Sequence, residues 1–206
     1  MARSQAKSDK ILREAERLFS TNQSVSVRNI ADKAGVAIGL VTHHFGSYAG
    51  LLAALDRRLN KRLGKGLPTA TQLRAGGDRQ ESVVLFLCEL ARLDLADENR
   101  RLRKAAARAS WDWGPENESK VQTSYSELFD PLANGLELDA YIVKALWAIY
   151  QEALRLRFNN IIQPPGGVAT SIGGEVEAIQ AYIRPQIARL LRSGQVPSIR
   201  SSEGLI

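Results

Sequence analysis

The stretch that decides the fold is VRNIADKAGVAIGLVTHHFGS, residues 27–47. Its apolar spacing predicts two short helices, over residues 27–34 and 38–44, joined by a tight turn. Gly35 closes the first helix, because glycine adopts the positive φ that reverses a chain within so few residues. The segment therefore has the form of a helix-turn-helix unit.

Two such short helices bury too little apolar surface to be stable alone, so the flanking segments must support them. Residues 8–20 form an amphipathic helix, whose apolar face carries Ile11, Leu12, Ala15, Leu18 and Phe19. Ser47 can cap a fourth helix that runs to about Leu63. The first third of the chain thus predicts a compact three- or four-helix domain.

The charge of the chain is concentrated in that domain. Residues 1–65 hold 12 Lys and Arg against 5 Asp and Glu, a net charge of +7, whereas the rest of the 206 residues carries −1. A basic module attached to a nearly neutral one favours a nucleic acid as the partner of the first part.

The remainder of the chain is predicted to be helical, and no segment shows the period-2 alternation of a strand. Residues 64–79 are rich in glycine and are interpreted as a mobile linker, and Pro185 should kink or shorten the last helix. The fold class is all-α, with a DNA-binding domain over 1–63, a larger helical domain over 64–194 and a disordered tail over 195–206.

A stretch of roughly residues 8–63 resembles the N-terminal domain of the TetR-like transcriptional regulators. The leading helix ILREAERLF, the run VRNIADKAGV and the exit HHFGS match the usual pattern of that family. The resemblance implies a cytoplasmic, sequence-specific regulator, a ligand-responsive repressor that binds a near-palindromic operator as a homodimer. It also implies DNA contacts from Arg28, Ile38, Gly39, Leu40, Thr42, His43, His44 and Tyr48.

Several of these positions depart from the family pattern. Ile38, Leu40 and Thr42 stand where the family commonly has Lys or Gln, Thr or Ser, and Tyr, and Tyr48 stands in place of a phosphate-binding Lys. Apolar side chains can contact the thymine methyl group, and Thr can bond base edges or phosphate. The alternatives are that Arg28 is merely solvated and that Ile38 and Leu40 pack on the domain core.

The resemblance further implies a small-molecule effector and dimerisation through helices at about 138–161 and 175–193. Both helices carry regular apolar seams, although these could equally be buried inside one chain. The candidate pocket residues are aromatic or apolar: Phe86, Cys88, Trp111, Trp113, Tyr125, Phe129, Trp147 and Tyr150. Any of them could instead belong to the core.

Other classes of function lack support in the residues. The sequence shows no phosphate-binding glycine fingerprint or nucleophile motif, which argues against an enzyme, and no cofactor is expected. Adjacent His43 and His44 point about 100° apart on a helix and cannot chelate one metal ion. Cys88 lies in an apolar run and is expected to be inert, and no membrane span or secretory signal is predicted. The rival hypothesis is a helical dimeric binding module whose DNA-binding helices have degenerated.

Overall fold

The computed structural model describes residues 2–21, 25–109, 127–164, 167 and 171–193, and all regular structure in these ranges is helical. Four helices form the N-terminal domain: α1 (Ala2–Ser20), α2 (Val27–Ala34), α3 (Ile38–Phe45) and α4 (Tyr48–Leu63). The helix-turn-helix prediction is confirmed, with α3 extending one residue further. Helix α1 begins earlier than the apolar pattern indicated.

Local signals account for the bends between these helices. Ser26 caps α2 by accepting a hydrogen bond from the Asn29 amide at 3.1 Å, and Ser47 caps α4 by accepting from the Gly50 amide at 3.0 Å. Gly35 ends α2 with φ +62°, and its amide donates to the carbonyl of Asp32.

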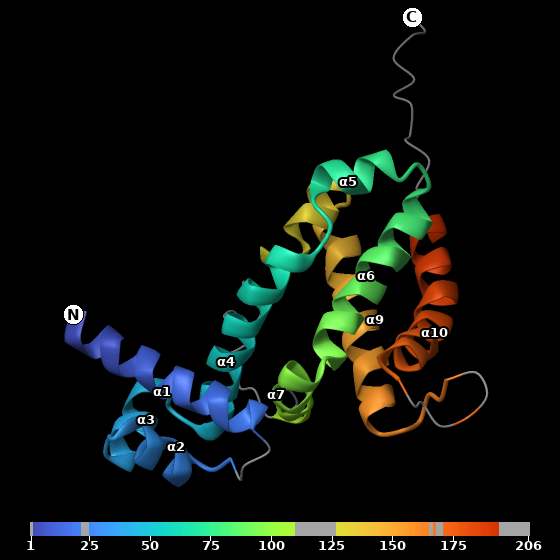
Figure 1. Ribbon diagram of the computed structural model, residues 1–206. Helices are drawn as coiled ribbons and strands as arrows, with labels where there is room; N and C mark the ends of the chain where they lie inside the picture. Colours follow the sequence, from blue (N-terminus) through green and yellow to red (C-terminus); the bar gives the residue numbers. More distant parts are fainter. Residues whose placement is uncertain (1, 22–24, 110–126, 165–166, 168–170, 194–206) are drawn as a thin grey trace, which may run out of the picture.

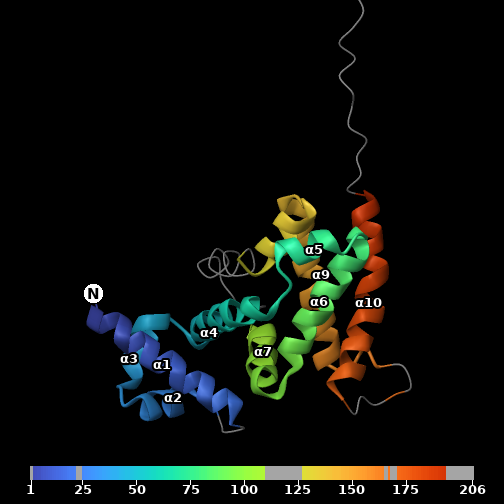
Figure 2. The same cartoon turned by 45° about the horizontal axis from the view of Figure 1, so that its top comes forward.

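The C-terminal part contains a short 3₁₀ turn (Gly64–Gly66) and the helices α5 (Ala70–Ala75), α6 (Arg79–Leu95), α7 (Asp97–Ala109), α9 (Ala140–Phe158) and α10 (Ile172–Ser193). Residues 127–136 are also helical. Helices α6, α9 and α10 pack side by side, and the N-terminal domain projects to one side of them (Figures 1 and 2).

The linker expectation for residues 64–79 was wrong, and Pro185 does not shorten the last helix. The stretch 64–79 is not an unstructured linker, because the Thr69 and Gln72 side chains form a capping box for α5 and Leu73 is buried. Helix α10 continues through Pro185 without a break. Pro185 and Ala181, whose carbonyl loses its helical partner, are both exposed, so water can satisfy that carbonyl.

Most apolar residues that α9 and α10 carry at regular spacing are buried inside the single chain. Ile179, Ile183 and Ile187 of α10 are fully buried, as is Ala153 of α9, while Ile142 is 5% exposed. The alternative hypothesis, that these residues are buried within one chain, therefore holds for most of them. The exposed residues of the two helices include Tyr141, Lys144 and Ala148 of α9 and Ala181 and Pro185 of α10.

A fully buried ionic cluster joins the N-terminal domain to the rest. Arg103 of α7 donates to Asp94 of α6 at 2.8 Å, and to Asp56 and Asn60 of α4 at 2.5 and 2.7 Å. The hydroxyl of Tyr150 on α9 donates to the second carboxylate oxygen of Asp94 at 2.6 Å. We call these five residues the Arg103 network. It connects four helices, and none of its members is more than 4% exposed.

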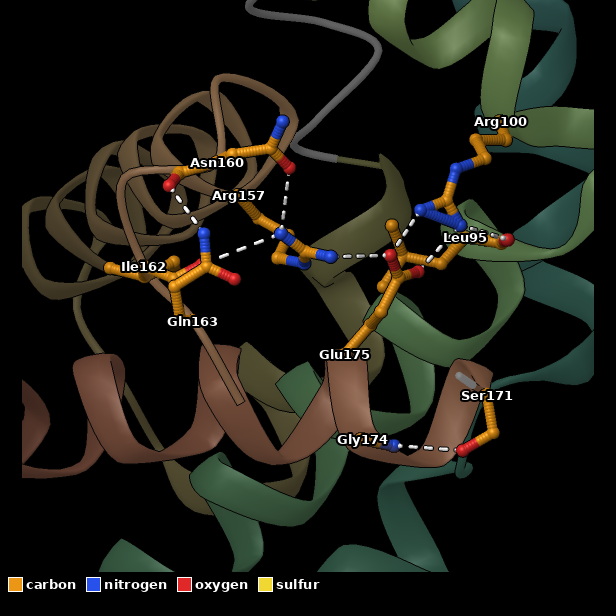
Figure 3. A network of polar contacts seen from close by, with 9 residues as sticks. All are labelled: Leu95, Arg100, Arg157, Asn160, Ile162, Gln163, Ser171, Gly174 and Glu175. Atoms are coloured by element: carbon orange, nitrogen blue, oxygen red, sulfur yellow. Dashed lines mark hydrogen bonds and ion pairs between the residues drawn. The ribbon is translucent and has the colours of Figure 1, made fainter. Parts of the chain in front are cut away.

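Helix α7 also bonds to α1 and α10 through Arg101 and Arg100. Arg101 donates to the Phe19 carbonyl at the end of α1, at 3.1 Å. Arg100 pairs with Glu175 at the start of α10, and Arg157 at the end of α9 donates to the same carboxylate at 2.7 Å (Figure 3). Helix α7 is thus bonded through its arginines to α1, α4, α6 and α10.

We expect Arg103→Met to lower the free energy of unfolding by about 3–5 kcal/mol, because it leaves two buried carboxylates without their cation. Burial already raises the pKa of Asp56 and of Asp94, against the opposing effect of Arg103. A carboxyl whose pKa is higher in the folded than in the unfolded state stabilises the fold more as the pH falls. The loss in this variant should therefore shrink when urea unfolding is repeated from neutral pH down to about pH 5.

The matched control is Arg92→Met, which removes an exposed pair with Glu89. It should cost less than about 1 kcal/mol. A loss in Arg103→Met no greater than in this control, or one independent of pH, would contradict the assigned role of the network.

Candidate nucleic-acid interface

Helix α3 packs on the N-terminal domain through buried Val41, and the side of the helix away from Val41 faces solvent. Val41 is 2% exposed and packs into the domain core, whereas Ile38 is 44% exposed. Gly39, Thr42 and His43 lie on the same outward side and are also exposed. In a helix-turn-helix, such an outward face of the second helix is the part that enters a DNA major groove.

Two glycines of the domain differ in what the fold requires of them. A Cβ added at Gly50 would lie 2.0 Å from the Phe45 carbonyl oxygen, so only glycine allows α4 to start so close to the end of α3. A Cβ added at Gly39 would meet nothing within 4 Å. Packing therefore explains Gly50 but not Gly39, which lies within a helix, where glycine is unfavourable.

Arg28 and Tyr48 lie near the starts of the helices that precede and follow α3. Arg28 is the second residue of α2, is exposed, and has no ion pair with any residue that the structure describes. Tyr48, the first residue of α4, is 39% exposed, and partial burial raises the pKa of its hydroxyl. The Tyr48 hydroxyl therefore stays protonated at neutral pH and can donate a hydrogen bond to a phosphate.

Leu40 and His44 are positioned differently from the other predicted contact residues. Both are half-buried. His44 lines a cleft of about 800 Å³ between α1 and α4, with Asp9, Ser47 and Arg57, and its Nε2 atom is buried without a hydrogen-bond partner. His44 therefore faces α1 and α4 and does not share the outward side of His43.

The predicted pocket residues divide into three groups. Phe86, Phe129, Trp147 and Tyr150 form a continuous chain of ring contacts, with neighbouring centroids 5.5–6.3 Å apart. Cys88 is half-buried nearby, and burial raises the pKa of its thiol to about 11, which makes it a poor nucleophile. Trp111, Trp113 and Tyr125 lie outside the described residues.

The aromatic chain is connected to the Arg103 network through Tyr150, which belongs to both. Its ring lies 6.3 Å from that of Trp147, and its hydroxyl bonds to Asp94. Phe86, Phe129 and Tyr150 are fully buried, whereas Trp147 is half-buried. A ligand that reached these rings would be two hydrogen bonds away from Arg103.

No group of three His, Cys, Asp or Glu side chains in the described ranges could hold a metal ion. No single helix in the same part of the chain is long and apolar enough to cross a membrane.

The comparison with known proteins agrees with this geometry. Residues 11–55 match the family model described as "Bacterial regulatory proteins, tetR family". The N-terminal domain is therefore similar to that family. The match covers α2, α3, the turn between them and most of α1 and α4, so the helix-turn-helix described above is of the TetR type.

Solved structures extend the likeness to the TetR-like fold as a whole. A TetR transcriptional regulator from Rhodococcus sp. RHA1 is similar with a TM-score of 0.63 and 19% identity, over 91% of this chain and 98% of that one. The multidrug binding protein EbrR, solved in complex with ethidium, is similar with a TM-score of 0.51 and 18% identity, over 89% and 98%. No curated protein sequence matches the chain. At these identities the likeness concerns the fold.

Sequence reasoning missed most of the Arg103 network. Asp56, Asn60, Asp94 and Arg103 were not singled out, and Tyr150 was considered only as a pocket residue. A signal was present, since Asp56 directly follows the apolar run LLAAL and Asp94 lies between Leu93 and Leu95. Buried positions of an amphipathic helix that carry a charge usually have a partner.

We expect Gly39→Ala and Gly50→Ala to change stability in opposite directions. Gly39→Ala should raise the free energy of unfolding by about 0.5–1 kcal/mol, because alanine is the better helix former and its methyl group enters open space. Gly50→Ala should lower it by about 1–3 kcal/mol through the clash with the Phe45 carbonyl. Urea unfolding of both variants measures this, and a loss of stability in Gly39→Ala would show that the fold itself requires glycine there.

Proposed function

We propose that the protein is a cytoplasmic, homodimeric transcriptional regulator that binds a near-palindromic DNA operator and is released from it by a small-molecule effector. The observation that carries this proposal is the outward face of α3. In a TetR-type helix-turn-helix it combines exposed Ile38, Gly39, Thr42 and His43 with a glycine that packing does not require. A helix N-terminal region so exposed can approach base edges.

The charge distribution supports DNA as the partner. The net charge of +7 over residues 1–65 attracts a polyanion, and exposed Arg28 forms no ion pair among the residues that the structure describes. Phosphate contacts of this kind position a protein on DNA and make its affinity depend on salt.

The direct test is selection of bound duplexes from a randomised pool at two salt concentrations. We expect a dyad-symmetric consensus with half-sites centred about one helical turn apart, or a multiple of it. Arg28→Ala should weaken binding to that site and reduce the slope of log affinity against log salt by about one. Arg92→Ala, which removes an exposed arginine of α6, serves as the control and should leave both unchanged.

The same experiment decides against or for the rival hypothesis. A binding module with degenerate DNA-binding helices would give only salt-sensitive background binding, with no consensus at either salt concentration. The residues that favour this rival are Ile38, Leu40, Thr42 and Tyr48, which replace the family's more polar contact residues. Their exposure, apart from Leu40, favours retained contact with DNA.

The proposed dimer uses the outward faces of α9 and α10. Their inward seams are already buried in the protomer, so the faces that remain carry exposed Tyr141, Lys144 and Ala148 on α9, and Ala181 and Pro185 on α10. Small residues at the centre of such a face let two helix pairs approach closely into a four-helix bundle. A two-fold axis there would present two copies of α3 to one face of DNA.

Replacing Ala148 and Ala181 together with glutamate should convert the dimer to a monomer, because four carboxylates would be forced into the interface. Sedimentation velocity measures the change, and operator affinity should fall with it. Ala75→Glu, at an exposed position of α5, is the matched control and should remain dimeric. A double variant that sediments like the control would place the interface elsewhere.

The proposed effector response is supported by the connection between the aromatic chain and α4. Tyr150 contacts the aromatic residues and belongs to the Arg103 network, which binds α4. An effector that shifted Tyr150 would alter the direction in which α4 carries the N-terminal domain, and a few ångströms would misalign the two copies of α3. A regulator that leaves its operator when the effector binds is most simply a repressor. A ligand that bound here and left operator affinity unchanged would contradict this mechanism.

A further inference from the structure

Helix α3 has an unusual inventory of side chains for a helix that reads DNA. Its residues 38–45 are IGLVTHHF, with no Arg, Lys, Asn, Gln, Asp or Glu. Guanine is normally recognised by Arg or Lys, adenine by Asn or Gln, and cytosine by Asp or Glu. Helix α3 can supply none of these contacts, so any base recognition by it must use other chemistry.

The chemistry that remains is apolar contact with the thymine methyl group, together with hydrogen bonds from Thr42 and His43. The C5 methyl of thymine is the one apolar group that a base pair presents in the major groove. Ile38 is the large apolar residue of α3 that the fold leaves exposed, at 44%, whereas Val41 is buried and Leu40 half-buried.

Ile38 also has the right place in the helix. It is the first residue of α3, and the N-terminal residues of a recognition helix are those that contact base edges. The next residue is Gly39, where the space beyond the backbone is open for at least 4 Å. The absence of a side chain there lets the backbone approach the bases, which brings Ile38 closer to the groove floor.

We propose that the operator half-site contains a thymine whose C5 methyl group packs against Ile38, and that this methyl group is a determinant of specificity. The inference rests on the proposed function, because it requires an operator. In this proposal, Ile38 and Gly39 contact the part of the half-site that contains the thymine. Recognition of guanine falls to His43 and, from outside α3, to Arg28.

Replacing single thymines of the selected operator by deoxyuridine tests this, because deoxyuridine lacks only the C5 methyl group. We expect one position in each half-site at which the replacement weakens binding about fourfold, the value for removing one buried methyl group from contact. Deoxyuridine at thymines outside the half-sites should leave the affinity unchanged.

A double-mutant cycle ties the effect to the side chain. In Ile38→Ala the same deoxyuridine replacement should cost less than about 1.5-fold, because the partner of the methyl group is gone. Ile38→Val, which keeps a shorter branched side chain, should retain part of the sensitivity. Ile161→Ala is the matched control: Ile161 is 61% exposed in the C-terminal part, and its truncation should leave the fourfold effect intact.

The outcomes separate this inference from the function on which it rests. Failure to select any consensus overturns the proposed function. A consensus whose thymines all tolerate deoxyuridine, or a deoxyuridine effect of equal size in Ile38→Ala, overturns the inference and leaves the regulator standing. A methyl effect that disappears only with the Ile38 side chain supports both.

Discussion

Arg103 lies where the N-terminal domain joins the rest of the chain, and its side chain is buried. Two carboxylates share this one cation, so the cluster carries a net negative charge, and removing these groups from water is costly. The cost is offset only if every bond forms with good geometry, and the bonds come from α4, α6, α7 and α9 at once. Few arrangements of four helices can satisfy this requirement. The direction of α4, and with it the position of the N-terminal domain, follows from it.

Helix α7 connects the other helices to one another because its arginines bond to different neighbours. Arg101 holds the end of α1, Arg103 holds α4, and Arg100 is bonded through Glu175 to the hairpin of α9 and α10 (Figure 3). Movement within the C-terminal helices must therefore either break a charged hydrogen bond or carry α7 along. This gives a physical basis for coupling between a pocket and DNA, since the connecting groups are contiguous and each bond to a charge is worth more than a neutral one.

Helices α2, α3 and α4 could be predicted almost to the residue because their signals are local. Ser26, Gly35 and Ser47 act within three or four residues of their own positions, and the apolar periodicity defines what lies between them. The Arg103 network could not be found in this way. Arg103 lies in the charged run DENRRLRK, which has the composition of a solvated helix face, and Asp56 is 47 residues away. Helix α5 was not predicted because the glycines around it are typical of a linker, although Thr69 and Gln72 form a capping box at its start.

Helix α3 departs from local rules at three neighbouring positions. Its N-cap is Ala37, which makes no side-chain hydrogen bond where Ser, Thr or Asp would contribute about 1 kcal/mol. Its first residue is an exposed isoleucine, and its second is a glycine with no packing role. Natural sequences tend to violate local rules where function requires it, and the cost is offset by packing elsewhere. Here Val41 and the close start of α4 at Gly50 hold the helix in place. The three exceptions stand side by side on one exposed tip, whereas chance would scatter them. That tip is the part of a helix-turn-helix that meets the bases.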